Sequence, residues 1–187
     1  MRAIGEGQPA TVVKSLTQAY YRVRSGLSFE KTVGEYGAFP TDPYSHTPAH
    51  AGAQQPGMTG QVKEEILTRF GELGVQVEEG VVRFNPIILR REEFLQVPAS
   101  YRFYDLQGSL RPIDLSADML GFSFCQVPVV YKLTVEEPWI RVIGANGESR
   151  KSQGNRLTPG DSQDLFKRTG GVSLIEVGVP ESSLCLT

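Results

Sequence analysis

The chain has 187 residues, of which 40% are hydrophobic and 21% are charged, so it can bury a core of ordinary globular size. Its formal net charge is -2 and no run of Lys and Arg exceeds two residues, which argues against nucleic acid as a partner. No apolar run approaches the ~18 residues of a membrane span, and the N-terminus has no signal-peptide pattern, so we expect a soluble, cytoplasmic protein that binds no membrane.

A first amphipathic helix is predicted between Pro9 and Gly26. Its apolar residues recur at helical spacing and so share one face: Val12, Leu16, Ala19, Tyr20 and Val23. Proline fits the first turn of a helix and glycine commonly follows the last one, which sets the two limits.

A second amphipathic helix is predicted from Thr59 to Gly74. Its apolar face consists of Val62, Ile66, Phe70 and Leu73. Thr59 is a favourable N-cap residue, and glycine is a common C-terminal signal. The long segment between the two helices has no clear period, and such a segment in a compact domain is usually functional. Two helices cannot close a core alone, so their apolar faces must pack on the rest of the chain or on a partner.

From Val75 onward the sequence predicts short strands. They are β-branched and aromatic runs bounded by turn residues: VQVEEGVVRF, SYRFYDL, MLGFSFCQ, VPVVYKLTV, WIRVIG and GVSLIEVGVP. The first run predicts a hairpin around Glu79-Gly80. The segment from Thr158 to Arg168 is predicted to form a short helix that lies over a sheet edge. Because no crossover helix separates most runs, we expect an antiparallel β-sandwich or jelly roll. The predicted fold class is α+β, with a helical segment at 1–74 and a β-sandwich at 75–187.

Four short motifs follow one another in a recognisable order. They are Asp42-Pro43-Tyr44, Thr59-Gly60, Leu73-Gly74 and VVRFNP, which ends at Pro86. This order resembles the end of the inverting glycoside phosphorylases of the cellobiose phosphorylase type, and of six-hairpin glycosidase-like proteins generally. In that family an (α/α)6 barrel finishes with a helix from T-G to L-G and a β-hairpin that closes on x-P. The charged segment QVKEE after Thr-Gly departs from the family pattern.

The resemblance implies that the helical segment is the last part of such a barrel and that Thr59 and Gly60 help to hold an attacking phosphate. The role is physically sensible, because the free N–H groups and the positive dipole end of a helix N-terminus attract anions. Taken alone, Thr59 is also explained as an ordinary helix cap. In the family the catalytic carboxylate lies upstream of everything in this chain, so no catalytic residue is assigned.

The segment before the second helix offers hydrogen-bonding side chains for a sugar. The candidate substrate-binding residues are Tyr44, His46, Gln54 and Gln55. The alternative is a loop whose polar groups are satisfied by its own backbone.

A metal site or cofactor is not expected. His46 and His50 are four residues apart, but Pro48 lies between them and no Glu completes an HExxH arrangement. Cys125 and Cys185 match no metal or redox spacing, so they are expected to be buried or bystander thiols.

The carboxylates and the single tryptophan are further candidates for catalysis and for sugar binding. Adjacent acids occur at Glu64-Glu65, Glu78-Glu79, Glu92-Glu93 and Glu136-Glu137, but neighbouring residues point apart, so solvated charge explains them better than a catalytic dyad. Trp139 either stacks on a sugar ring or fills the core, and its place at a strand start favours the core.

The sequence therefore predicts the C-terminal portion of a carbohydrate-active protein of the glycoside phosphorylase or hydrolase type, inactive alone. Its expected partner is the remainder of an (α/α)6 barrel, and its expected ligands are an oligosaccharide and phosphate. Two alternatives remain. One is a stand-alone carbohydrate-binding module, and the other is a structural or interaction protein that self-associates through Val12, Leu16 and Tyr20.

Overall fold

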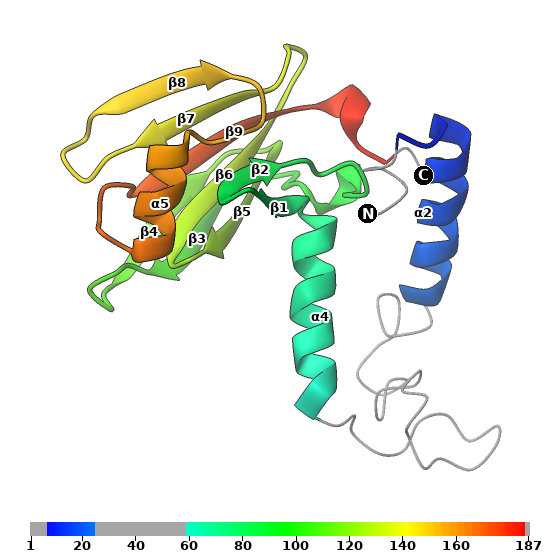
Figure 1. The fold of residues 1–187 in the computed structure, drawn as a ribbon, viewed down its shortest axis with the longest axis horizontal. Coiled ribbons are helices and arrows are strands. Elements are labelled where there is room, and N and C mark those ends of the chain that lie inside the picture. The colour runs from blue at the N-terminus through cyan, green and yellow to red at the C-terminus, as the bar shows by residue number, and fades with distance from the viewer. Residues whose placement is uncertain (1–6, 25–58, 186–187) are drawn as a thin grey trace. The chain divides into compact units, whose positions relative to one another are not determined.

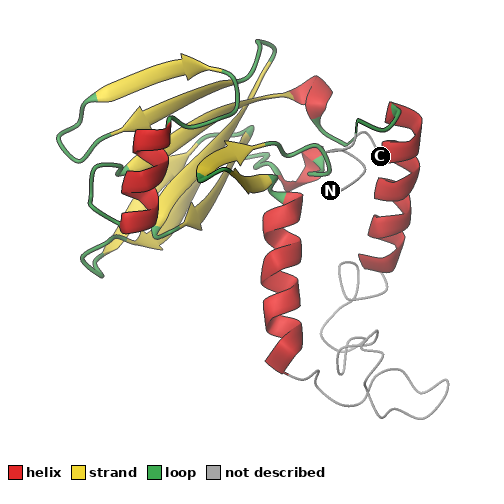
Figure 2. Ribbon diagram, viewed as in Figure 1, coloured by secondary structure: helices red, strands yellow, loops and turns green. Residues whose placement is uncertain are grey.

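The computed structural model describes residues 7–24 and 59–185 (Figure 1). The chain divides after Arg69 into two compact units, and the second unit comprises Phe70–Leu186. The described residues contain α-helices together with mostly antiparallel sheets, which confirms the predicted α+β class (Figure 2).

Both helices predicted in the N-terminal part are present. Helix α2 spans Ala10–Arg24 and so begins directly after Pro9. Helix α4 spans Thr59–Glu72, two residues short of the predicted end at Gly74. The positive φ of +69° at Gly74 explains this end, because a left-handed glycine just beyond the last turn is a common helix terminator.

Two hairpins precede the main sheet. Strands β1 (Val75–Glu78) and β2 (Val81–Phe84) pair around Glu79-Gly80, as predicted, and both turn residues have positive φ. Strands β3 (Ala99–Tyr104) and β4 (Leu110–Leu115) form the second hairpin.

Asp105 organises the turn of the second hairpin. Its Oδ1 accepts hydrogen bonds from the backbone N–H groups of Gln107 and Ser109, and its Oδ2 accepts one from Arg111 Nε at 2.9 Å. The hydrogen bond from Arg111 is the main reason that the pKa of this carboxyl lies below its usual range.

The main sheet has five strands in the order β5-β6-β9-β7-β8. Their limits are β5 Met119–Phe124, β6 Val127–Thr134, β7 Trp139–Ile143, β8 Ser149–Gln153 and β9 Leu174–Pro180. Neighbouring strands are antiparallel except β6 and β9, which are parallel.

The parallel pair departs from the purely antiparallel expectation. A parallel pair needs a long crossover between its strands. Here the crossover consists of the whole β7-β8 hairpin and helix α5 (Pro159–Lys167), after which β9 enters between β6 and β7. Helix α5 itself matches the prediction: Thr158 caps its start, and Arg168 ends it in the left-handed conformation.

One face of the five-stranded sheet forms the core. Alternate residues of the three central strands are buried there: Val127, Val129, Tyr131, Ile140, Val142, Ile175, Val177 and Val179. They belong to one cluster with Leu73 beyond α4, Val82 and Phe84 of β2, and Leu165 of α5. Helix α5 lies beside β2 (Figure 1). The Leu157 N–H, just before the helix, donates to the Val82 carbonyl at 2.9 Å.

Within residues 7–24 and 59–185, no helix combines the length and the apolar character that crossing a bilayer requires.

The β5–β6 turn stores backbone strain that a substitution should release. Cys125 and Gln126 are its two central residues, with φ of 52° and 63°, a conformation that favours Asn and Gly. We expect Gln126→Gly to raise the free energy of unfolding by about 1 kcal/mol, measured by urea denaturation. The same change at Gln153, at the end of edge strand β8, is the control and should lower stability by roughly 0.5–1 kcal/mol. Equal effects of the two variants would contradict this account of the turn.

Candidate functional site

The predicted sugar and phosphate residues fall mostly outside the described part of the chain. Tyr44, His46, Gln54 and Gln55 all lie there, as does His50. Thr59 and Gly60 are the first two residues of α4, so the helix begins where the resemblance requires its phosphate-holding pair. The first turn of α4 carries no acidic residue that would repel an anion.

The opposite end of α4 is anchored in the β-rich unit. Leu73 is 3% exposed, and its carbonyl accepts a hydrogen bond from the hydroxyl of Tyr131, a fully buried residue of β6. Gly74 lies so close to the chain at Asn85 that an added Cβ would be 2.1 Å from the Asn85 carbonyl carbon. The Asn85 N–H in turn donates to the Gly74 carbonyl at 2.7 Å. No residue other than glycine fits this position without moving the backbone.

This contact gives a physical reason for two of the four sequence motifs. Leu73-Gly74 and Asn85-Pro86 lie on either side of the β1–β2 hairpin, and their backbones meet at its base. Sequence reasoning identified both motifs but not the contact, because nothing local in either motif shows that the two segments pack together.

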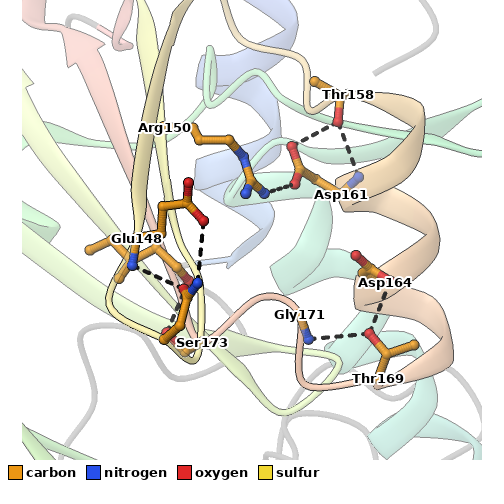
Figure 3. Close-up of polar contacts among 10 residues, drawn as sticks. Glu148, Arg150, Thr158, Asp161, Asp164, Thr169, Gly171 and Ser173 are labelled. Atoms are coloured by element: carbon orange, nitrogen blue, oxygen red, sulfur yellow. Dashed lines mark hydrogen bonds and ion pairs between the residues drawn. The ribbon is translucent and has the colours of Figure 1, made fainter.

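Polar side chains at the start of α5 form hydrogen bonds with one another (Figure 3). Asp161 is 7% exposed and accepts hydrogen bonds from Arg150 at Oδ1 and from Thr158 Oγ1 at Oδ2, so both carboxylate oxygens have partners. The fully buried Ser162 accepts a hydrogen bond at Oγ from the Val82 N–H, at 3.1 Å. The group therefore joins β8, β2 and α5, which is a structural role.

The loop after α5 is closed by a second set of contacts in the same view. Thr169 Oγ1 donates to Asp164 Oδ1 at 2.9 Å and accepts from the Gly171 N–H at 3.2 Å (Figure 3). These bonds fix the turn that leads into β9.

Five of the six adjacent carboxylates whose side chains are described are solvated, and the exception is Glu93, which is only partly exposed. Glu78, Glu79, Glu92, Glu136 and Glu137 are all exposed. Glu72, in the last turn of α4, is fully buried instead. Sequence reasoning missed it, because its neighbours do not distinguish it from an exposed helical glutamate.

Cys125 and Cys185 are both partly buried. Burial raises the pKa of the Cys125 thiol, which keeps it protonated at neutral pH and weakly nucleophilic. Across the two described ranges, no group of three or more His, Cys, Asp or Glu side chains is arranged to hold a metal ion.

Trp139 lies on the sheet face opposite the core. Ile140 and Val142 of the same strand belong to the core cluster, and successive strand residues point to opposite faces. Its partner in β9 is Gly178, where an added Cβ would lie 2.2 Å from the indole Nε1. The indole therefore rests directly on the Gly178 backbone. Trp139 is buried, at 9% exposure, as the sequence favoured, but it lies outside the main core cluster.

Charged residues surround this indole. Glu176 of β9 accepts hydrogen bonds from Lys132 of β6 at 2.6 Å and from Arg141 of β7 at 3.0 Å. The Lys151 ammonium of β8 lies 4.5 Å from the Trp139 ring centroid, within cation–π range. One face of the sheet thus holds an aromatic ring, three cations and one carboxylate across four adjacent strands.

The β3–β4 hairpin packs near the β5 edge of the same sheet. The Tyr101 hydroxyl lies 2.7 Å from Ser123 Oγ, and the side chains of Tyr101 and Leu115 both approach Gly121 of β5. At the other edge, Lys151 and its β8 neighbours are exposed. Solvent therefore reaches the indole's surroundings from the β8 side.

Comparison with protein-family models and with curated proteins found no match for this chain. The family resemblance therefore stays a prediction that depends on the sequence motifs.

The hydrogen bond between Tyr131 and Leu73 should be important to stability. Tyr131→Phe leaves a buried carbonyl without its donor, which costs about 1–3 kcal/mol in unfolding free energy. Urea denaturation followed by circular dichroism measures the change. Tyr104→Phe is the matched control, because Tyr104 is 63% exposed and should change stability by less than about 0.5 kcal/mol. A Tyr131 variant as stable as this control would contradict the anchoring role.

Proposed function

We propose that this chain is the C-terminal portion of a carbohydrate-active protein of the glycoside phosphorylase or hydrolase type. In this proposal α2 and α4 end an (α/α)6 barrel, and the β-rich unit is the antiparallel β-sandwich that follows it in the cytoplasmic protein. The chain contributes a substrate-binding rim and needs the remainder of the barrel for an active site.

The observation that supports this proposal is the exposed apolar surface of the two helices. Val12 and Leu16 of α2 are 41% and 54% exposed, and Ile66 and Leu67 of α4 are 50% and 70% exposed. Val12 and Leu16, one turn apart, belong to the face predicted to be buried. Apolar side chains that remain in water along a helix face mark an interaction surface. A barrel completed by further helices would bury them.

The two ends of α4 support the same proposal. At its start, Thr59 and Gly60 supply helix N–H groups, and the first turn of α4 contains no acidic residue, which suits a phosphate. At its end, the close contact between Gly74 and Asn85 explains why the L-G and x-P motifs occur together.

Self-association is the second candidate, and the same exposed residues favour it. A second copy that covers Val12 and Leu16 would remove them from water as effectively as a barrel would. The two proposals differ in what the partner supplies, since a second copy brings no catalytic carboxylate of the barrel. Activity therefore separates them.

The test is to produce the chain together with the polypeptide encoded immediately upstream and to assay phosphate-dependent cleavage of β-linked disaccharides. We expect no cleavage by the isolated chain and cleavage by the assembled pair. Thr59→Ala should raise the KM for phosphate about tenfold, because it removes one hydrogen bond to a charged ligand. Thr68→Ala, further along α4, is the control and should leave the KM unchanged.

Three outcomes would contradict the proposal. They are cleavage by the isolated chain, an inactive assembled pair, and saturable binding of neutral β-linked disaccharides by the monomeric chain. The last result would favour a stand-alone carbohydrate-binding module. A stable homo-oligomer that neither binds nor cleaves these sugars would favour self-association.

A further inference from the structure

The sheet face around Trp139 has features that the structural role of the sheet does not require. We define the Trp139 face as Lys132, Trp139, Arg141, Lys151 and Glu176. These residues come from β6, β7, β8 and β9, and strand register places them side by side without any contribution from loops.

Two rows of residues cross this face. One row holds Glu176, Arg141 and Lys151 on β9, β7 and β8, and the next holds Gly178, Trp139 and Gln153 on the same strands. With neighbouring strands about 4.8 Å apart, the four strands span roughly 14 Å. A surface of this width accommodates a mono- or disaccharide.

The charges on the face do not balance. Glu176 is paired with both Lys132 and Arg141, so its single negative charge is shared between two cations, and Lys151 adds a third. The face therefore carries three positive charges against one negative charge, on a chain whose formal net charge is -2. Arg141 and Lys151 are also direct partners on antiparallel strands, and like charges in that position destabilise a sheet. An anion bound between them would remove this repulsion.

The indole is 9% exposed, so a ligand reaches the ring only where the cationic side chains beside it move aside. One side of the ring rests on Gly178, the residue type that leaves room for this close approach. The Arg141 guanidinium lies over the ring at 5.6 Å from its centroid, and the Lys151 ammonium lies closer, at 4.5 Å. Lys151 is exposed, and a cation–π contact at an exposed site contributes only about 0.5–1 kcal/mol. A ligand ring can displace this ammonium at small cost, and the displaced ammonium stays close enough to pair with an acidic group on the ligand.

We propose that the Trp139 face binds an acidic sugar. The apolar face of the pyranose ring stacks on the indole, and the carboxylate or phosphate of the sugar pairs with Lys151 and Arg141. The choice of a sugar rests on the function proposed above, whereas the need for a flat ring with a negative charge rests on the geometry of the face.

The chain contains a single tryptophan, so emission excited selectively from tryptophan reports on this face alone. The experiment titrates the full chain with glucuronate and with glucose 6-phosphate, and in parallel with glucose, inorganic phosphate and benzoate. We expect both acidic sugars to change the emission saturably. Glucose, inorganic phosphate and benzoate should bind at least tenfold more weakly.

Charge variants locate the site. Lys151→Gln should weaken binding of both acidic sugars at least fivefold, because it removes a direct partner of the anion. Lys167→Gln removes an equal charge at the exposed end of α5 and should leave the affinity unchanged. Circular dichroism confirms that each variant is folded.

Several results would overturn the inference. No saturable change with either acidic sugar would exclude the site. If inorganic phosphate or benzoate bound as tightly as the acidic sugars, the proposed recognition of a sugar ring would be excluded. Wild-type affinity in the Lys151 variant would exclude the cationic pairing. The binding experiment and the cleavage assay test different proposals. If the chain binds acidic sugars but the assembled pair does not cleave disaccharides, the Trp139 site is retained and the proposed function is overturned.

Discussion

The C-terminal end of α4 is held in the β-rich unit by a hydrogen bond and a close backbone approach. Tyr131 donates to the Leu73 carbonyl, and Gly74 packs against the chain at Asn85 with no room for a side chain. Leu73 is itself part of the core cluster. Because Tyr131 lies in β6, which pairs with both β5 and β9, the end of the helix and the main sheet are parts of one packed structure.

The two faces of the five-stranded sheet then have different roles. The face that receives Leu73, β2 and α5 is apolar and supplies the stability of the unit through buried area. With that face filled, the opposite face is open to polar residues, and it carries the ion pairs of Glu176 and the indole of Trp139. A scaffold stabilised on one side can tolerate the like-charge pair of Arg141 and Lys151 on the other, which is the kind of local cost that binding surfaces carry.

Local sequence patterns predicted the helices and the turn, but they did not predict which distant strands pair. The two N-terminal helices, the Glu79-Gly80 turn and helix α5 followed from apolar period, turn residues and capping. The insertion of β9 between β6 and β7 has no local signal, so the parallel pair was missed. Trp139 is buried as predicted, but a strand with apolar residues on both sides does not reveal on which face of the sheet it lies. The decisive residue is its cross-strand partner Gly178, and register is needed to find it. The predicted sugar-binding residues, all before Thr59, lie outside the described part of the chain.

Hydrogen–deuterium exchange of the full chain tests the junction at the end of α4 most directly. If the helix end and the main sheet are parts of one packed structure, the amides of Glu72 to Gly74 are protected to the same extent as those of β6, and both lose protection together in the Tyr131→Phe variant. Fast exchange at Glu72 to Gly74 while β6 stays protected would show that the helix end opens independently, and it would contradict the account.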